Sequence, residues 1–243
     1  MAHLPEVLRA RIPNFREYHG KTKTFKVFMF ESGKCIEILV DNLFAKIYVK
    51  PVFNDISPII LEKAYAQSYG NFDVLKIGQS NDALRDLTGA PAFYLDMKDK
   101  AELRDKIKSG FANKYAMVVG SKQQTPNKSI SEAHSYTILN YEMVNGQLYL
   151  LLRDPRGHTK ANFSAPQQLV GIPEMGTFWV DEKNLELNFE VISVCKVRKN
   201  YSYFFKTFDK KELVNNRGGL LLNVSKPGKI YATIHQKHKK FFD

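Results

Sequence analysis

The chain has 243 residues, 44% of them hydrophobic, which is enough apolar material to bury a full core. It contains no run of about 18 apolar residues, which excludes a membrane-spanning helix of the usual length. Cys35 and Cys195 are the two cysteines, so a disulfide framework and a cysteine-rich zinc site are excluded, and a reducing compartment is expected.

The formal net charge of +11 is concentrated at the two ends of the chain. Residues 1–26 carry six Lys or Arg against two acids, residues 196–243 carry twelve against three, and the middle carries eighteen against twenty. Basic ends suit an acidic partner, and we expect other protein subunits of a larger assembly, with nucleic acid as an alternative. The predicted contact residues are Lys237, Lys239 and Lys240. An ordinary solvated surface is the competing interpretation.

The N-terminal part of the sequence predicts an extension followed by a hairpin. Residues 1–24 are interpreted as a basic N-terminal extension without the apolar segment of a secretory signal. An intracellular location is therefore expected, cytoplasmic or cytoskeletal, with a mitochondrial one left open. Residues 25–31 and 35–40 are rich in apolar side chains on either side of Ser-Gly-Lys, which predicts two strands joined by a turn.

Three helices are predicted between this hairpin and residue 111. Ser57 as N-cap and Pro58 in the first turn begin one helix, which ends before Gly70. A shorter helix is predicted to follow Ser80 as its cap. Residues 99–111 predict a third helix, because their apolar side chains recur on one face.

From residue 115 onward the hydrophobic pattern changes to that of strands. The predicted strands are residues 115–120, 134–144, 147–153, 177–180 and 191–197. Asn145-Gly146 indicates a type I′ turn between the second and third of these strands, and residues 181–189 predict a short helix. The expected fold class is therefore α+β, with an antiparallel sheet and a few helices.

Residues 199–243 predict a second, all-β unit. Three short β-like segments occur there, separated by Gly-rich and Pro-Gly turns. Three short strands make a poor independent domain. The unit is therefore expected to be incomplete or to be completed by a partner.

A histidine and an acid lie at the two feet of the hairpin that turns at Asn145-Gly146. His134 begins the first strand and Asp154 follows the second, so closing the hairpin brings the two side chains together. A histidine oriented by an acid or an amide is the arrangement that takes the proton of a catalytic thiol. The same pattern is typical of a local hydrogen bond that ties two strand ends, and this structural interpretation stands beside the catalytic one.

The segments around this hairpin resemble the second half of the catalytic core of the calpain cysteine proteases. PIILEKAYAQSYG is similar to a helix of the family, AHSYTIL to the strand around its catalytic histidine, and LLLRDPRG to the strand that ends at its asparagine. GTFWVDEKNLELNFEVISVCKV resembles the end of the core. The resemblance implies a calpain/papain-like second protease subdomain over residues 25–198 and the start of a β-sandwich over residues 199–243.

The resemblance also implies roles for single residues. His134 matches the catalytic histidine of the family, and Asp154 stands where the family has its orienting asparagine. The family's cysteine lies upstream of the first hairpin, where this sequence has about 26 residues and no cysteine. We therefore expect a pseudoprotease, a structural or binding subunit in which His134 and Asp154 are vestigial. Cys35 and Cys195 are interpreted as small core hydrophobes.

No cofactor is expected, and calcium is not expected either. Residues 158–169 lack the acids that supply calcium ligands in the family that the chain resembles. Asp181 and Glu182 match positions near other calcium ligands of that family. Two acids that begin a helix are explained more simply by their favourable interaction with the helix dipole.

Two other functions stay open. One is half of a split calpain-like cysteine protease whose cysteine comes from another chain, which His134 and its strand favour. The other is a structural protein of a ribonucleoprotein assembly, which the basic ends favour. If the pair is only structural, Asp154 should raise the pKa of His134, unless Arg156 binds the carboxylate instead.

Overall fold

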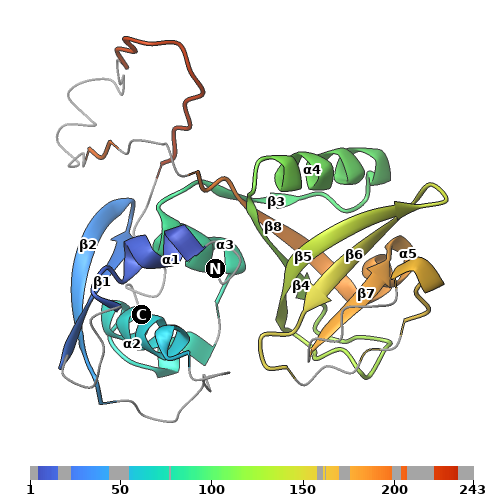
Figure 1. Cartoon of the computed structure of the whole chain (residues 1–243), viewed down its shortest axis with the longest axis horizontal. Helices are drawn as coiled ribbons and strands as arrows, with labels where there is room; N and C mark the ends of the chain where they lie inside the picture. The colour runs from blue at the N-terminus through green and yellow to red at the C-terminus, as the bar shows by residue number, and fades with distance from the viewer. Residues whose placement is uncertain are drawn as a thin grey trace.

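The computed structural model describes most of the chain and shows two antiparallel sheets with helices packed on them (Figure 1). The described residues are 5–15, 23–43, 55–76, 78–157, 161, 163–169, 176–198, 204–206 and 222–234. Within these ranges no helix is long and apolar enough to cross a bilayer. The predicted α+β class with antiparallel strands is confirmed.

The smaller sheet is the predicted hairpin, formed by β1 (Thr24–Glu31) and β2 (Lys34–Asp41). Helices α1 (Pro5–Arg11) and α2 (Ser57–Tyr69) pack against it. Apolar side chains from β1, β2, α2 and the segment after α1 form one buried core: Ile12, Phe25, Val27, Met29, Ile38, Val40, Ile60 and Ala64. The hairpin thus has its own core, separate from that of the larger sheet.

Residues 1–24, interpreted above as a basic N-terminal extension, include helix α1. Leu8 and Ile12 are four residues apart and therefore face the same side of the chain. Ile12 is 1% exposed and Leu8 packs beside it on the hairpin core. The basic residues Arg9 and Arg11 lie in the last turn of this helix, where positive charge is favoured.

The larger sheet has six strands in the order β3-β8-β4-β5-β6-β7, all antiparallel to their neighbours. The strands are β3 (Ala92–Leu95), β4 (Ala116–Ser121), β5 (Ser135–Val144), β6 (Gln147–Arg153), β7 (Thr177–Asp181) and β8 (Phe189–Cys195). The last of these six strands in sequence, β8, lies between β3 and β4. Strand β4 is therefore interior, with a paired neighbour on each side.

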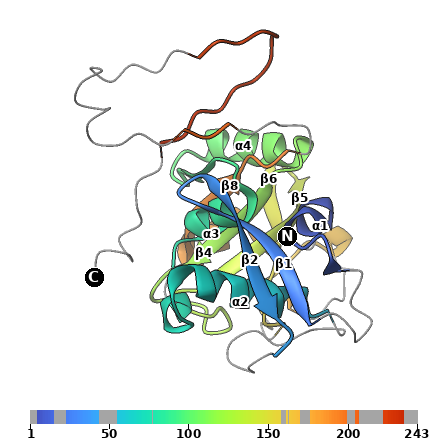
Figure 2. The same ribbon diagram turned by 90° about the vertical axis from the view of Figure 1, so that its left-hand side faces the viewer.

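Helices cover both faces of the larger sheet (Figures 1 and 2). On one face, α4 (Lys100–Ala112) and α5 (Glu182–Asn188) enclose the core around Tyr136. On the other face, α3 (Ser80–Thr88) packs over Cys195 and also contacts β1. Helix α3 is therefore the element that joins the hairpin to the larger sheet. Two short 3-10 helices lie in loops: η2 (Asp73–Lys76) and η3 (Gln167–Leu169).

Two predicted helix caps are wrong, because each serine is already the first helical residue and Ile56 and Gln79 are the N-caps. Ser57 is buried inside the first turn of α2, and its backbone N–H donates to Asp55 Oδ1 at 2.9 Å. Ser80 is the first residue of α3, and its hydroxyl lies 2.9 Å from that of Ser135 on β5. A serine with a tertiary partner is not available as a cap.

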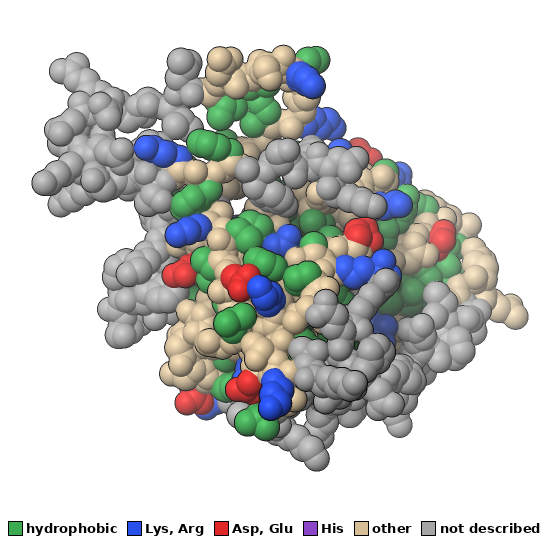
Figure 3. All heavy atoms as spheres, turned by 60° about the vertical axis from the view of Figure 1, so that its left-hand side comes forward, with side chains coloured by type: hydrophobic (Ala, Val, Ile, Leu, Met, Phe, Trp, Pro, Cys, Tyr) green, Lys and Arg blue, Asp and Glu red, His purple; other side chains and the backbone are tan. Residues whose placement is uncertain are grey.

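The C-terminal region has no strand within its described residues, 204–206 and 222–234, whose side chains are mostly exposed. The start of a β-sandwich over residues 199–243 stays a prediction. The predicted contact residues Lys237, Lys239 and Lys240 lie outside the described residues. On the face shown in Figure 3, the basic side chains that are described lie scattered among hydrophobic and acidic ones and do not form one patch.

Candidate active site

His134 and Asp154 lie together at the base of the β5-β6 hairpin. His134 Nε2 is 3.0 Å from Asp154 Oδ1. The Asp154 side chain is 1% exposed and that of His134 is 13% exposed, so the contact is largely shielded from water. An ionised carboxylate only accepts hydrogen bonds, so Nε2 carries the hydrogen and Nδ1 keeps its lone pair. This tautomer leaves Nδ1 able to take a proton.

A tight turn and a β-bulge place the two residues. Asn145 and Gly146 have φ values of 51° and 78°, as a type I′ turn requires. The pairing of β5 with β6 shifts by one residue between Ile138 and Asn140, which leaves Leu139 as the extra residue. Such bulges re-aim side chains beside functional sites. The turn was predicted from the sequence, whereas the bulge was not.

The backbone of His134 is fixed by Ser121, the last residue of β4. Ser121 N–H donates to the His134 carbonyl at 2.8 Å, and His134 N–H donates to Ser121 Oγ at 2.9 Å. The Ser121 hydroxyl donates to the Ser131 carbonyl at 2.6 Å. The imidazole packs edge-on against Tyr136, with the ring centroids 5.0 Å apart. Sequence reasoning missed Ser121, because a serine at a strand end has no distinctive pattern in a single sequence.

Asp154 is held from the other side by Gly176. Asp154 N–H donates to the Gly176 carbonyl at 2.8 Å, and Arg156 N–H donates to Asp154 Oδ1 at 2.9 Å. Gly176 has a φ of 79°, and a Cβ there would lie 2.8 Å from Gly157 Cα and 3.1 Å from the Asp154 carbonyl oxygen. The position therefore needs glycine both for its conformation and for the close approach. The Gly- and Pro-rich sequence before β7 indicated a turn but not this contact.

The pKa of His134 lies below its usual value because burial disfavours the charged ring, and the positive charge of Arg156 acts in the same direction. The hydrogen bond and the charge of Asp154 act against this lowering. The expected rise of the pKa is therefore wrong. The carboxylate is present as predicted, but the pair is buried, and burial was not visible in the sequence. Neutral pH thus favours the neutral imidazole, which can act as a base.

Neither cysteine lies beside His134. Cys195 is fully buried and pairs with Ala116, at the opposite end of β4 from Ser121, so the two ends are about 16 Å apart at ~3.3 Å per residue. Burial raises the pKa of Cys195 to about 11. Cys35 is exposed in the separate β1-β2 hairpin. Cys195 fits the expected core role, whereas Cys35 is not a core residue, because it faces solvent.

The two acids near the family's calcium positions already have partners. Asp181 is the N-cap of α5, and its carboxylate accepts from Asn184 N–H at 2.8 Å. Glu182 accepts two hydrogen bonds from Arg104 of α4, both of 2.6 Å. Within the described ranges, no group of three or more His, Cys, Asp or Glu side chains could hold a metal ion. Both acids therefore act as structural groups at the start of α5.

Comparison with known proteins identifies the family. Residues 1–196 match the model of the calpain family cysteine proteases. The chain is similar to the calpain-type cysteine protease DEK1 of Zea mays, with 26% identity over 68% of the chain and 9% of the relative. It is also similar to the calpain-type cysteine protease ADL1 of Oryza sativa subsp. japonica, with 26% identity over 81% of the chain and 10% of the relative. Calpain-9 of Mus musculus is 26% identical over 73% of the chain and 31% of its own length.

This match corrects the expectation of a pseudoprotease. That expectation rested on the absence of a cysteine upstream of the first hairpin, but the chain spans only about a tenth to a third of the length of these relatives. The family model covers most of the chain, and the family and the relatives from Zea mays and Oryza sativa are described as cysteine proteases. The chain therefore belongs to the calpain family of cysteine proteases.

Proposed function

We propose that this chain supplies the base of a calpain-type cysteine protease site, with His134 as the general base and Asp154 as the residue that orients it. Residues 25–198 are then the second subdomain of a calpain/papain-like core. The observation that supports this proposal is the buried 3.0 Å contact between the two residues that match the family's catalytic histidine and orienting asparagine.

The chemistry follows from the tautomer of the pair. Asp154 accepts the Nε2 hydrogen, and Nδ1 takes the proton from a cysteine thiol. The thiolate attacks the carbonyl carbon of a peptide bond, and the imidazolium returns its proton to the leaving amine. Water then hydrolyses the thioester, with the imidazole again accepting a proton.

The replacement of asparagine by Asp154 alters the charge balance of the site but not the hydrogen bond. A carboxylate favours the imidazolium more strongly than an amide does, whereas burial and Arg156 favour the neutral ring. The opposing effects keep the imidazole a usable base at neutral pH. A thiolate placed against Nδ1 would raise the pKa of His134 again, because opposite charges attract.

The catalytic thiol in this proposal lies on a calpain-type first subdomain outside this sequence. Cys195 is buried at the far end of β4, and Cys35 lies in the other sheet. The partner that completes the site is then a protein segment of the same family. This is the alternative of a split calpain-like cysteine protease, in which another chain supplies the cysteine.

The test is to assay the protein together with a calpain-type first subdomain that carries a cysteine, using a fluorogenic peptide and an electrophilic peptide label. The variant His134→Ala is expected to lower the peptidase rate by about 10²–10⁴-fold, which is the usual contribution of a general base. Labelling is expected on the cysteine of the first subdomain.

Matched controls separate the roles of the residues. Cys195→Ser and Lys34→Gln should keep the activity, because one residue is buried far from His134 and the other is exposed on the small hairpin. Activity that survives His134→Ala, or that is lost in Cys195→Ser while the variant stays folded, would contradict the proposal. Circular dichroism on each variant checks folding.

A further inference from the structure

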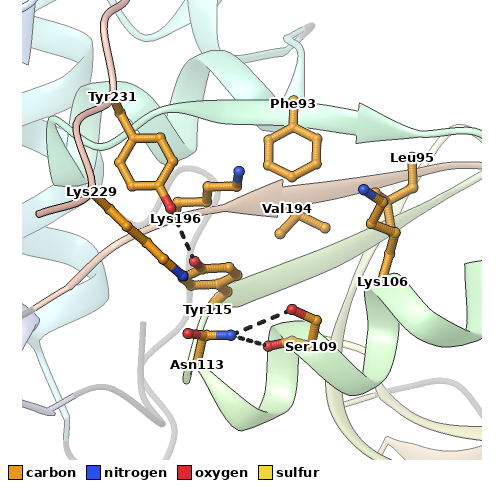
Figure 4. A pocket seen from close by; sticks show the side chains of 10 residues that line it. All are labelled: Phe93, Leu95, Lys106, Ser109, Asn113, Tyr115, Val194, Lys196, Lys229 and Tyr231. Atoms are coloured by element: carbon orange, nitrogen blue, oxygen red, sulfur yellow. Dashed lines mark hydrogen bonds between the residues drawn. The ribbon is translucent and has the colours of Figure 1, made fainter.

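A cavity of about 270 Å³ lies at the end of the larger sheet opposite to His134. Its walls come from β3, β8, α4 and the segment 222–234, as Figure 4 shows. Tyr115, just before β4, is one of the lining residues, whereas Ser121 at the other end of β4 binds His134. The cavity is thus separate from the candidate active site.

Positive charge dominates this cavity. Lys106, Lys196 and Lys229 line it, and no lining residue is an Asp or Glu. The Lys196 ammonium group lies 4.8 Å from the ring centroid of Phe93 and 4.7 Å from that of Tyr231. Aromatic rings therefore hold Lys196 in place. A concave wall lined by one sign of charge strengthens the local potential and attracts an anion.

Among the described residues, the acid paired with a lining lysine compensates this charge only weakly. Lys106 has Glu102 at 3.7 Å, one turn earlier on α4, and both side chains are half exposed to water. Such an exposed pair contributes little. Burial alone would raise the pKa of Tyr115, yet this pKa is lowered, because the Tyr231 hydroxyl, Arg198 and Lys196 favour the phenolate. The phenol thus responds to the same positive surroundings.

Besides the lysines, the wall has a polar part, formed by Ser109, Asn113 and the two tyrosines, and an apolar part. Val194 and Leu95 are buried core residues, and Phe93 is partly buried beside them. The cavity is smaller than the roughly 300–1,000 Å³ typical of sites for drug-sized ligands. It therefore has room for an anionic group and one small flat group.

We propose that this cavity binds a small phosphate monoester, with the phosphate at the lysine ammonium groups that line it and an aromatic or similarly flat group against Val194 and Leu95. Lysine is a common partner of phosphate, and a dianion matches several ammonium groups better than a carboxylate does. The proposal is independent of the protease site proposed above.

The ligand would also join two parts of the chain. Lys229 and Tyr231 belong to the segment 222–234, whereas Lys106 and Lys196 belong to the sheet and helix layer. A bound phosphate bridges the two sets of lysines. Binding therefore protects this segment against trypsin, which cleaves after exposed lysines such as Lys226 and Lys229.

The test is an NMR titration of the full chain with phenyl phosphate, inorganic phosphate, benzoate and benzyl alcohol. Phenyl phosphate should bind at least about fivefold more tightly than each of the others, since it alone combines a dianion with a ring. Backbone amide signals of β8 should shift. Binding should weaken with added salt, and trypsin cleavage within 222–234 should slow at saturating phenyl phosphate.

Single variants locate the site. Lys196→Gln and Lys229→Gln should each weaken phenyl phosphate binding by at least about fivefold, whereas the exposed Lys34→Gln should leave it unchanged. The proposal is overturned if Lys34→Gln weakens phenyl phosphate binding as much as the cavity variants do, or if the cavity variants do not weaken it. It is also overturned if benzoate binds as tightly as phenyl phosphate. Vesicles of phosphatidylcholine with phosphatidic acid test a lipid source of the phosphate. Vesicle binding without phenyl phosphate binding would also overturn it.

Discussion

The two ends of strand β4 carry ionisable groups in opposite situations. At the Ser121 end, Asp154 is buried and His134 is largely buried; His134 N–H donates to the Ser121 hydroxyl, and Asp154 accepts from the N–H of Arg156. At the Tyr115 end, lysines surround a cavity that no carboxylate lines. The same sheet thus carries a hydrogen-bonded His–Asp pair at one end and lysines without a lining carboxylate at the other. Removing one member of the pair should therefore lower the stability of the protein, whereas the lysine end should respond to the binding of an anion.

Asp154→Ala should have the largest effect on stability. The substitution removes the buried acceptor of the Arg156 N–H and of the Nε2 hydrogen of His134. We expect this loss to lower the free energy of unfolding by about 3 kcal/mol. Asp154→Asn keeps an acceptor and should cost clearly less. Urea denaturation measures both. Equal costs for the two variants would contradict this explanation, because they would assign the stabilisation to the negative charge and not to the accepted hydrogen bonds.

Gly176→Ala should have the second-largest effect on stability. A Cβ at Gly176 meets backbone atoms of Gly157 and Asp154, whereas a Cβ at Gly146, which has nearly the same φ, meets nothing within 4 Å. We expect a cost of about 2–3 kcal/mol at Gly176 and about 1 kcal/mol at Gly146, where only the backbone conformation is unfavourable. Thermal unfolding of both variants checks the difference, and a larger loss at Gly146 would contradict it.

The pH dependence of His134 should give a smaller effect with a defined sign. Its pKa is lowered in the folded protein, so between this value and the ordinary value of about 6.5 the unfolded chain binds more protons. The contribution to stability is therefore complete above about pH 6.5 and is lost as the pH falls through this range. NMR titration of the imidazole measures the pKa directly.

Arg156→Gln provides the matched test of the cause. Removing the positive charge should raise the pKa of His134, while the hydrogen bond from the backbone N–H of residue 156 to Asp154 is kept. An unchanged pKa in this variant would assign the lowering to burial alone.

The smallest effect is expected at the cavity. Lys229 is exposed, and its replacement by Gln should change the free energy of unfolding by no more than about 0.5 kcal/mol in the absence of ligand. Chemical denaturation measures this difference. A large loss of stability would show that the lysine is a structural residue, which would remove the contrast between the two ends of β4.

The fold was predictable where one short pattern decides the structure. The alternation in β1 and β2 and the Asn145-Gly146 turn gave the two hairpins, and the second hairpin brought His134 to Asp154. Strand β3 was missed, because four residues at a sheet edge have too little pattern. Helix α1 was not predicted, because its seven residues include three charged ones and leave only a narrow apolar face.

Properties that depend on the surroundings were not predictable. The sign of the pKa shift at His134 follows from burial, which is set by the sheet and its neighbours and not by the two residues. Ser121 and Gly176 act through backbone contacts with residues distant in sequence. The cavity joins β3, α4, β8 and the segment 222–234, and no single segment of the sequence indicates it.

The position of α3 makes the reactivity of Cys195 a measure of how often this helix separates from the larger sheet. Cys195 Sγ lies 3.2 Å from the Thr88 hydroxyl of α3 and is fully buried, so a thiol reagent reaches it only when this helix lifts from the sheet. The rate of alkylation at Cys195 therefore measures the frequency of this separation. The dependence of the rate on denaturant concentration distinguishes local movement of α3 from global unfolding. Because α3 also contacts β1, the same rate reports how firmly the small hairpin is attached to the sheet that bears His134.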